Sequence, residues 1–299
     1  MLSKFIESLH VRFSTANFRE IVKPFIVKSK VDKSNTIVMV NRGHLRMNDE
    51  SEFAPEGSFY FIPAGRKMSV SHGLNPEVEF NSYTQILEIE GQEYLKAVTS
   101  KDQLENVKEL LTFVRFDVEL FDIIPFFSSL DLPIFHIEPN EELSFLLKRI
   151  AIEQESKRLG YNNIITNYMG ELLIYICRYI ESQPDLQQYL TKLEFLADKR
   201  LVDIVKYVGE NLDKDLSNKT IASIAFISED YVGQFFKSLT KKNLQDYIEN
   251  QRLEMAMRLL KTIPDNIQEI AHKVGFKDPA YFSRRFKLRY GINANSVRR

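Results

Sequence analysis

Hydrophobic and polar positions follow one short pattern twice in the last third of the chain. The first copy runs from Ile221 to Lys237 and the second from Ile270 to Lys287. Each copy has Ile-Ala, an apolar residue four or five positions later, a short polar turn, and an aromatic-led run ending in Phe-Lys. This pattern predicts a helix, a tight turn and a second helix held together by its apolar positions. Two copies about fifty residues apart indicate a duplicated unit.

A single helix is predicted between the two copies, from about Leu244 to Ile263, with Pro264 ending it. Its apolar residues recur at the i, i+3, i+4 and i+7 positions of one helix face. They are Leu253, Ala256, Met257 and Leu260. A stiff connection of this kind would fix the distance between the two copies.

The first third of the chain lacks this helical periodicity and instead contains short β-favouring runs separated by turn residues. TIVMV, HLRMN, SFYFIP and KMSVS alternate with NRG, DES, APEG and AGR between residues 36 and 71. Closely spaced strands of this length predict an antiparallel β-barrel or sandwich. Residues 1–35 predict one strand after an irregular start, VEFNSYTQILEIE adds one or two strands, and a helix is expected around Lys101–Val114.

Two amphipathic helices follow and are predicted to form an antiparallel pair around Leu159-Gly160-Tyr161. The first contains NEELSFLLKRIAIEQESK, and the second runs from Ile164 to Ile180. Their apolar faces hold six residues that a core within the domain would bury. These residues are Leu143, Leu147, Ile165, Met169, Leu172 and Ile176.

Length and charge divide the chain in the same way. A chain of 299 residues favours two domains, and the break to Ser-Gln-Pro at 182–184 places the boundary there. The predicted organisation is a β domain over 1–135, the helical pair over 136–184, a linker over 185–198 and a helical domain over 199–299. Residues 201–299 hold 17 Lys and Arg against 12 Asp and Glu, a net charge of +5 on a chain whose total is −1. A positive end on an otherwise acidic protein fits a polyanionic partner.

No apolar run approaches 18 residues, and the start MLSKFIESLHVRF lacks the apolar region of a signal peptide. We therefore expect a cytoplasmic protein without a membrane partner. The single cysteine, Cys177, allows no internal disulfide, which fits a reducing compartment.

The repeated region resembles the double helix-turn-helix DNA-binding domain of AraC/XylS-type bacterial transcription regulators, from about Lys199 to Arg299. The residues that carry the resemblance are Ser228, Tyr231, Phe236, Arg252, Ala256, Leu259-Leu260, Ile270-Ala271, Gly275-Phe276, Tyr281-Phe282, Phe286 and Gly291. The chain departs from the family's pattern at three places. Lys241-Lys242 stand where the family has Thr-Gly after the first recognition helix, Asn293-Ala294 where it has Thr-Pro, and Gln234 where an Arg is common.

The resemblance implies that the second helix of each copy enters a major groove of double-stranded DNA. Residues expected on the outer faces of these helices, and so able to contact bases, are Asp230, Gln234, Ala280, Ser283 and Arg284. Gln pairs with adenine and Arg with guanine, so Gln234 and Arg284 are the leading base readers, whereas Asp230 also suits the helix N-terminus. Basic residues expected to contact phosphates are Lys237, Lys277, Arg285, Lys287, Arg289 and Arg298.

The run PEGSFYFIPAG resembles, more loosely, the turn and strand of the cupin-like sensor domains that precede such DNA-binding domains. The resemblance covers roughly residues 20–90 and implies a barrel that could hold an effector. Candidate pocket residues are Phe59, Phe61, Tyr83 and Ile86, although most of them are expected to belong to the packed core. Metal-binding cupins need clustered histidines, but this region has only His44 and His72, so no metal or other cofactor is expected.

The fold class expected is therefore α+β, with a cupin-like antiparallel β-barrel and a helical pair before an all-α domain of two helix-turn-helix units. The expected function is a sequence-specific transcription regulator. The resemblance implies an activator that works with RNA polymerase and responds to a small molecule or a partner protein. It also implies a homodimer whose contact uses the helical pair, at Leu143, Leu147, Ile165, Met169, Leu172 and Ile176. The alternative is a cupin-type enzyme fused to a DNA-binding tail, and the scattered histidines argue against it.

Overall fold

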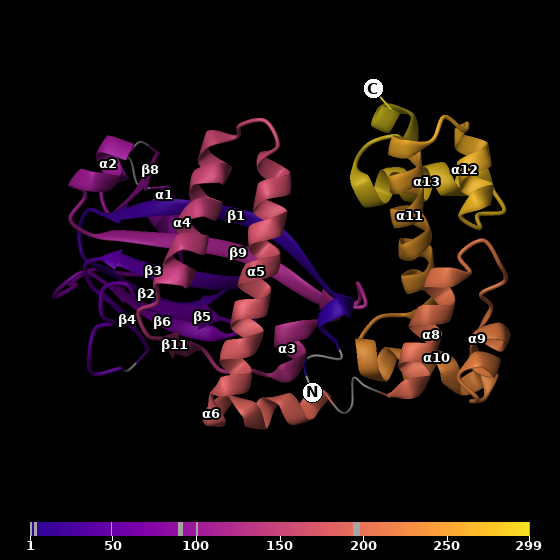
Figure 1. Cartoon of the computed structure of the whole chain (residues 1–299), viewed down its shortest axis with the longest axis horizontal. Coiled ribbons are helices and arrows are strands. Elements are labelled where there is room, and N and C mark those ends of the chain that lie inside the picture. Colours follow the sequence, from indigo (N-terminus) through magenta and orange to yellow (C-terminus); the bar gives the residue numbers. More distant parts are fainter. Residues whose placement is uncertain are drawn as a thin grey trace. The chain divides into compact units, whose positions relative to one another are not determined.

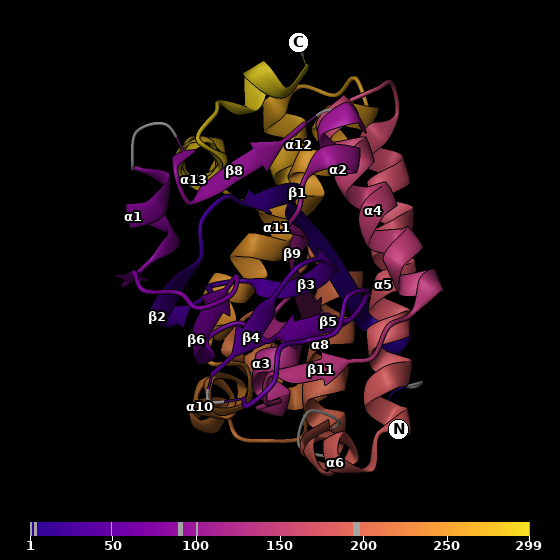
Figure 2. The ribbon, with the colours of Figure 1, turned by 90° about the vertical axis from the view of Figure 1, so that its left-hand side faces the viewer.

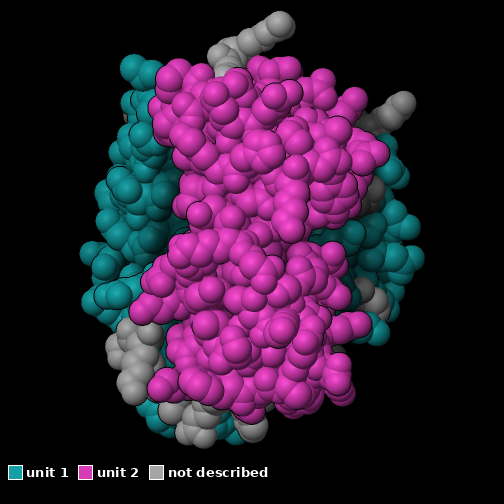
Figure 3. Space-filling model, turned by 90° about the vertical axis from the view of Figure 1, so that its right-hand side faces the viewer, with its two compact units in different colours: residues 1–192 teal, residues 193–299 magenta. Residues whose placement is uncertain are grey.

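The protein is described from a computed structural model covering all residues except 1, 3–4, 49, 89–91, 100, 194–197 and 299. The chain divides into two compact units, Met1–Lys192 and Leu193–Arg299, which are coloured separately in Figure 3. The division falls inside the segment 185–198 for which a linker was predicted. The predicted helical pair belongs to the first unit together with the strands.

The larger sheet of unit 1 is antiparallel, in the order β11-β5-β3-β9-β1-β8, with β10 also paired to β9 (Figure 1). Its strands are β1 (Leu9–Ile21), β3 (Asn35–Arg42), β5 (Phe59–Ile62), β8 (Leu95–Val98), β9 (Leu110–Leu120), β10 (Ile124–Pro125) and β11 (Phe135–Ile137). Central strand β9 pairs along most of its length with β1 and β3, so residues far apart in sequence share one face.

The smaller sheet has the order β4-β6-β2-β7, and its β2–β7 pairing is parallel. Its strands are β2 (Phe25–Val31), β4 (Leu45–Met47), β6 (Lys67–His72) and β7 (Glu79–Phe80). Side chains of both sheets share one core, which includes Phe25 and Val70 from the smaller sheet and Val38 and Phe113 from the larger. The described strands thus form two open sheets, and the expected closed barrel is not confirmed.

Helices α4 (Glu141–Ser156) and α5 (Tyr161–Ser182) lie against the other face of the larger sheet, where α4 contacts β1 and β9 and α5 contacts β1 (Figure 2). Asn140 caps α4 by accepting a hydrogen bond from the Leu143 amide at 2.8 Å. The predicted antiparallel helix pair is confirmed. Shorter helical segments of unit 1 are η2 (Ile6–Ser8), α1 (Tyr83–Leu87), α2 (Lys101–Asn106), α3 (Phe126–Leu130), α6 (Pro184–Gln187) and η4 (Gln188–Lys192).

Two expectations for unit 1 were wrong. The helix expected around Lys101–Val114 ends at Asn106, and Leu110 begins the long central strand β9. Leu110–Leu120 holds Val, Phe and Thr, and strand pairing on both sides outweighs the helical pattern. The first 35 residues form two strands instead of one. In VEFNSYTQILEIE the expected strand is Glu79–Phe80, and the helix Tyr83–Leu87 follows it.

Unit 2 is all-helical. Its helices are α8 (Lys199–Glu210), α9 (Asn218–Ile224), α10 (Glu229–Thr240), α11 (Leu244–Thr262), α12 (Ile267–Lys273), α13 (Pro279–Tyr290) and η5 (Ala294–Arg298). Helices α9 and α10 pack together, as do α12 and α13, and α11 contacts α10, α12 and α13. The duplicated helix-turn-helix pattern and the connecting helix from Leu244 are therefore confirmed.

The apolar positions of the repeat form the cores of unit 2. In the second copy, α11 and the helix pair bury Leu253, Ile270, Phe282 and Phe286 in one cluster. In the first copy Ile221, Val232 and Phe236 are buried at the positions of Ile270, Phe282 and Phe286, and Phe235 is buried as well. No helix in the described part of the chain combines the length and apolar character needed to cross a membrane.

Candidate nucleic-acid interface

The second helix of each copy begins where the sequence predicts. Helix α13 has Asp278 as its N-cap, whose side chain accepts from the Ala280 amide at 2.8 Å, and Pro279 stands in its first turn. Helix α10 has Ser228 at the N-cap position, but its hydroxyl makes no capping hydrogen bond. Glu229 and Asp230 in the first turn of α10 still place negative charge at its positive end.

The inner face of each second helix is apolar, with one correction. Phe235 and Phe236 of α10 and Phe282 and Phe286 of α13 are buried as expected. The two tyrosines expected inside are partly exposed. Tyr231 is 44% exposed and Tyr281 is 40% exposed, because each stands at the edge of the packed stripe.

The outer faces carry every residue expected to contact bases. Asp230, Gln234, Ala280, Ser283 and Arg284 are all exposed. The Ser283 hydroxyl, however, donates to the Pro279 carbonyl of its own helix at 2.9 Å, so its hydrogen is engaged locally. Gln234 on α10 and Arg284 on α13 therefore remain the side chains best suited to reading base edges.

The basic residues expected at phosphates divide into two groups. Lys237, Lys277 and Lys287 are exposed. Arg285 instead donates to Glu249 of α11, a bond that raises the pKa of the Arg285 guanidinium, and Arg289 lies 3.5 Å from Glu254. The side chain of Arg298 lies outside the described residues. The lysines are therefore the freer charges, and the two arginines are tied to the connecting helix.

Glu249 is a residue that the sequence analysis missed. One carboxylate oxygen accepts from the Tyr281 hydroxyl at 2.6 Å, and the other accepts from Arg285. Both partners lie more than thirty residues along the chain on α13, so no local pattern marks the contact. Glu249 thereby joins the connecting helix to the second recognition helix.

A second set of hydrogen bonds joins α11 to the loop before α9. Arg252 donates from Nε to the Leu212 carbonyl at 2.9 Å and from a terminal nitrogen to the Lys214 carbonyl at 3.0 Å. Burial lowers the pKa of Arg252, which nevertheless stays a cation at neutral pH because an arginine pKa starts so high. Gly275 lies so close that an added Cβ would stand 2.1 Å from the Leu212 oxygen.

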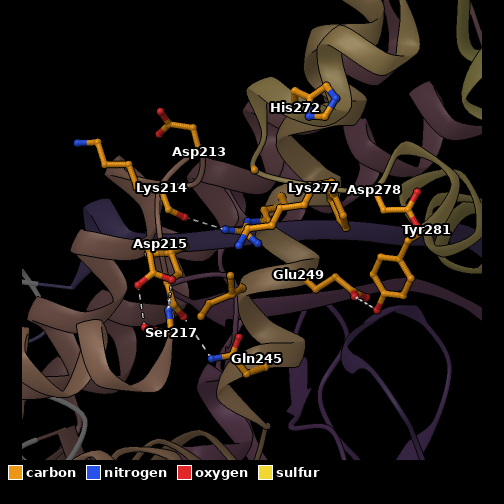
Figure 4. Close-up of a pocket in the computed structure, with 15 residues that line it drawn as sticks. Asp213, Lys214, Asp215, Ser217, Gln245, Glu249, His272, Lys277, Asp278 and Tyr281 are labelled. Carbon is orange, nitrogen blue, oxygen red and sulfur yellow. Dashed lines mark hydrogen bonds between the residues drawn. The ribbon is translucent and has the colours of Figure 1, made fainter.

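These contacts surround a pocket of about 740 Å³ between the two copies (Figure 4). Its wall comes from the loop at 213–217, from Gln245, Glu249 and Arg252 of α11, and from residues 272–281 of the second copy. Gln245 also donates to the Leu216 carbonyl at 3.2 Å. Side chains of α11 thus fix the relation of the two copies from both sides of this pocket.

In unit 1 the four residues expected to line an effector pocket do not come together. Phe61 packs on Phe127 and Phe135, and Phe59 shares its side of β5, since alternate residues of a strand face the same way. Ile86 and Tyr83 instead pack with the core shared by the two sheets. Phe59, Phe61 and Ile86 are at most 1% exposed, so only Tyr83 is available to a ligand.

The six residues expected at a dimer contact are all buried within unit 1. Leu143, Leu147, Ile165, Met169, Leu172 and Ile176 are at most 1% exposed. They therefore hold α4 and α5 to the sheet. Any contact with a second copy would have to use the opposite faces of these helices.

The two histidines of the strand region and the single cysteine do not form one site. His72 is fully buried with Nε2 2.5 Å from the Tyr83 hydroxyl, and burial lowers its pKa to about 3. His44 pairs with Glu109 at 3.2 Å. Burial raises the pKa of the Cys177 thiol to about 12, far from that of an activated nucleophile. Within the described ranges, no group of three His, Cys, Asp or Glu residues could hold a metal ion.

Comparison with known proteins places this interface in a family. Residues 221–299 match the family described as a helix-turn-helix domain. The chain is 23% identical over 277 residues to the HTH-type transcriptional regulator MtrA of Neisseria gonorrhoeae, covering 88% of this chain and 85% of that one. It is 24% identical over 263 residues to the HTH-type transcriptional regulator AlkR of Acinetobacter baylyi, covering 85% and 83%.

A solved structure is also similar over the C-terminal third. The DNA-binding domain of AdpA in complex with a target DNA is 28% identical, with a TM-score of 0.32, and the match covers 33% of this chain and 88% of that one. The family match and the two long relatives settle the class of protein. Residues 221–299 form an AraC/XylS-type helix-turn-helix domain, and the chain is a DNA-binding transcription regulator and not an enzyme.

Proposed function

We propose that this AraC-type regulator reads its operator with α10 and α13 in two successive major grooves, about 34 Å apart along one side of the duplex. The observation that carries the proposal is the pair of recognition helices with exposed polar faces, joined through the connecting helix α11. Glu249 of α11 bonds to α13, and Arg252 of α11 bonds to the loop before α9. These hydrogen bonds would keep the distance between the two recognition helices constant. A constant distance is needed if both helices are to enter successive major grooves.

Base contacts are proposed for Gln234, Arg284, Ser283, Ala280 and Asp230, and Arg284 is the strongest of them. A guanidinium donates two parallel hydrogen bonds to a guanine, the commonest specific contact in the major groove. Phosphate contacts are proposed first for Lys237, Lys277 and Lys287, which are exposed. Arg285, Arg289 and Arg298 would add to them, and the first two would have to share their charge with the glutamates of α11.

For unit 1 we propose a cupin-like sensor that binds a small molecule in the cytoplasm. A ligand that prefers one arrangement of the protein would raise the population able to bind DNA productively. The output would be activation through RNA polymerase. The two sheets with one shared core offer a scaffold for such a site, and similarity to full-length regulators over more than four-fifths of the chain supports a regulatory role for unit 1.

A homodimer is proposed through the exposed faces of α4 and α5. Along α5, Thr166, Gly170, Ile174 and Arg178 border a shallow surface pocket of about 770 Å³, on the opposite side from the buried stripe. Ile174 is half-buried there and Gly170 adds no side chain, which would let a second helix approach closely.

The DNA proposal is tested by selecting bound fragments from genomic DNA with the full chain, then measuring affinity for the selected site by fluorescence anisotropy. We expect a motif with two half-sites one helical turn apart. Arg284→Ala should weaken that site selectively, while Arg258→Ala, an exposed arginine on α11, should not. Equal losses of affinity for both variants, or a motif with one half-site only, would overturn the proposal that both helices enter the major groove.

The dimer proposal is tested by sedimentation of the full chain at several concentrations. Ile174→Glu places a charge in the proposed contact and should shift the protein toward monomer, while Lys148→Glu on the exposed side of α4 serves as a second probe of the same helix pair. A protein that stays monomeric throughout, or a dimer that tolerates both changes, would exclude this contact.

A further inference from the structure

Unit 1 contains a second cavity, of about 290 Å³, on the face of the larger sheet that is turned toward the smaller sheet. Its lining includes Asn17, Arg19, Lys30, Tyr83, Phe113 and Arg115. Asn17 pairs with Phe113 across β1 and β9, and Thr15 pairs with Arg115, so the four side chains of β1 and β9 share one face. None of the three cations was singled out by the sequence.

The cavity carries more positive than negative charge. Arg19, Lys30 and Arg115 face a single acid among its lining residues, Asp32. That acid is already engaged, because Lys30 donates to it at 2.7 Å and both side chains are nearly buried. The two guanidinium groups of Arg19 and Arg115 are left without a carboxylate among the described lining residues.

Arg115 has an unpaired buried donor, and Arg19 lies beside its like charge. Arg115 Nε is buried and has no hydrogen-bond partner among the described residues. Arg19 Nε donates to Asn17 at 3.1 Å, and burial together with the neighbouring charge of Arg115 lowers the pKa of Arg19. A buried donor without a partner costs stability, and two like charges side by side add to that cost. An anion with two acceptor oxygens would relieve both.

Apart from Ser82, the rest of the lining is formed by apolar and aromatic side chains. Leu95 and Phe113 are buried, while Val31 and Leu87 are 53% and 52% exposed and so reach toward solvent. The Tyr83 hydroxyl is occupied by His72, and Lys30 lies over the Tyr83 ring with Nζ 4.5 Å from its centre. A ligand would therefore meet cations on one side and hydrocarbon on the other.

We propose that this cavity binds a small amphipathic carboxylate, whose oxygens accept from Arg115 and Arg19 and whose hydrocarbon part contacts Phe113 and Leu95. A planar guanidinium matches the two oxygens of a carboxylate, and the apolar lining selects against an anion without a hydrocarbon body. The inference rests on the proposed sensing role of unit 1 and names the chemical class of its ligand.

The test is calorimetric titration of the full chain with octanoate and benzoate, and with the uncharged octanamide and benzamide. At least one carboxylate should bind at least about tenfold more tightly than its amide, as loss of a charge-assisted hydrogen bond predicts. Inorganic phosphate should also bind about tenfold more weakly than that carboxylate. Amides that bind equally well, or no binding of either carboxylate at millimolar concentration, would overturn the proposal.

Variants locate the site. Arg115→Gln and Arg19→Gln should each weaken carboxylate binding about tenfold. Arg46→Gln, an arginine of β4 that lies over Phe53 away from the cavity, should leave binding unchanged. Thermal unfolding checks that each variant is folded. If one of the two arginine variants does not fold, the other still tests the site. Unchanged binding in both cavity variants would overturn the site.

Operator affinity measured with and without the bound carboxylate separates this inference from the proposed function. If the carboxylate binds at Arg115 but operator affinity and transcription are unchanged, the cavity assignment stands and the sensing role fails. If the operator is bound with two half-sites but neither carboxylate binds, the DNA-reading role stands and the cavity assignment fails.

Discussion

Phe226 and Gly275 occupy the same place in the two helix-turn-helix copies, and both have a left-handed backbone, with φ of +55° and +89°. The hydrogen bonds around them correspond one to one. Ile227 N donates to the Ala222 carbonyl at 3.0 Å, and Phe276 N donates to the Ala271 carbonyl at 2.9 Å, which is the 6→1 bond of a Schellman motif. The Schellman hydrogen bonds thus set the turn in both copies, and its left-handed position is occupied by residues as different as Phe and Gly.

Packing explains why the residues differ. The Phe226 side chain is 93% exposed and meets nothing that would exclude it. At Gly275 an added Cβ would stand 2.1 Å from the Leu212 oxygen and 2.8 Å from Arg252 Nε. The turn of the second copy packs against Leu212 and Arg252, whereas the turn of the first copy is exposed to solvent.

The two recognition helices also share a backbone arrangement but carry different side chains on their outer faces. The outer face of α10 offers Asp230, Gln234 and Lys237, with little net charge. The outer face of α13 offers Arg284 and Lys287, and Glu249 of α11 holds Arg285 beside them. The second copy should therefore supply more of the salt-dependent affinity, and the first more of the neutral hydrogen bonding.

The largest effect should come from Gly275→Ala. A methyl group at a left-handed position and against the Leu212 carbonyl should destabilise unit 2 by about 3 kcal/mol or more. Phe226→Ala places the same residue, alanine, at the exposed turn of the first copy and should cost less than about 0.5 kcal/mol. Urea unfolding of both variants checks this, and equal losses would show that the two turns are not packed differently.

Base reading should depend on a different residue type in each copy. Arg284→Ala should cost about 1–3 kcal/mol on the selected operator and relax preference at one base pair of the second half-site. Gln234→Ala should relax a different base pair, in the first half-site, where an adenine is expected. Competition with single-base operator variants measures both, and relaxation at the same base pair would contradict the assignment of one helix to each half-site.

Phosphate binding should distinguish free from paired cations on α13. Lys287→Ala should reduce the slope of log affinity against log salt by about 1 and weaken all sequences alike. Arg285→Ala should reduce it less, because Glu249 already neutralises much of that charge. Anisotropy titrations over a range of salt concentrations measure the two slopes. A larger change for Arg285→Ala would mean that DNA displaces Glu249.

The smallest effect is a gain in stability. Phe226→Gly removes the cost of a left-handed non-glycine residue, and part of the gain is lost to the greater freedom of glycine in the unfolded chain. Unit 2 should become about 0.5–1 kcal/mol more stable in urea unfolding. A loss of stability would show that the exposed Phe226 ring makes a contact that the turn geometry does not reveal.

Much of unit 2 could be predicted from its residues. The capping position of Asp278, the helix from Leu244 and the buried Phe282 and Phe286 follow from periodicity and capping within a few turns of helix. The outer positions of Gln234 and Arg284 follow from the same periodicity. Unit 1 was harder, because Leu110–Leu120 is a strand only through its pairing with β1 and β3.

By itself the sequence determined that two helix-turn-helix units exist, where each second helix begins and where its polar outer face lies, because all of this depends on residues a few positions apart. Tertiary structure alone decided that Glu249 holds Arg285, that Gly275 meets the Leu212 carbonyl, and that Arg19 and Arg115 share a cavity. These partners lie between 36 and 96 positions apart in the chain, and no local pattern records which distant residues will be brought together when the apolar faces are buried.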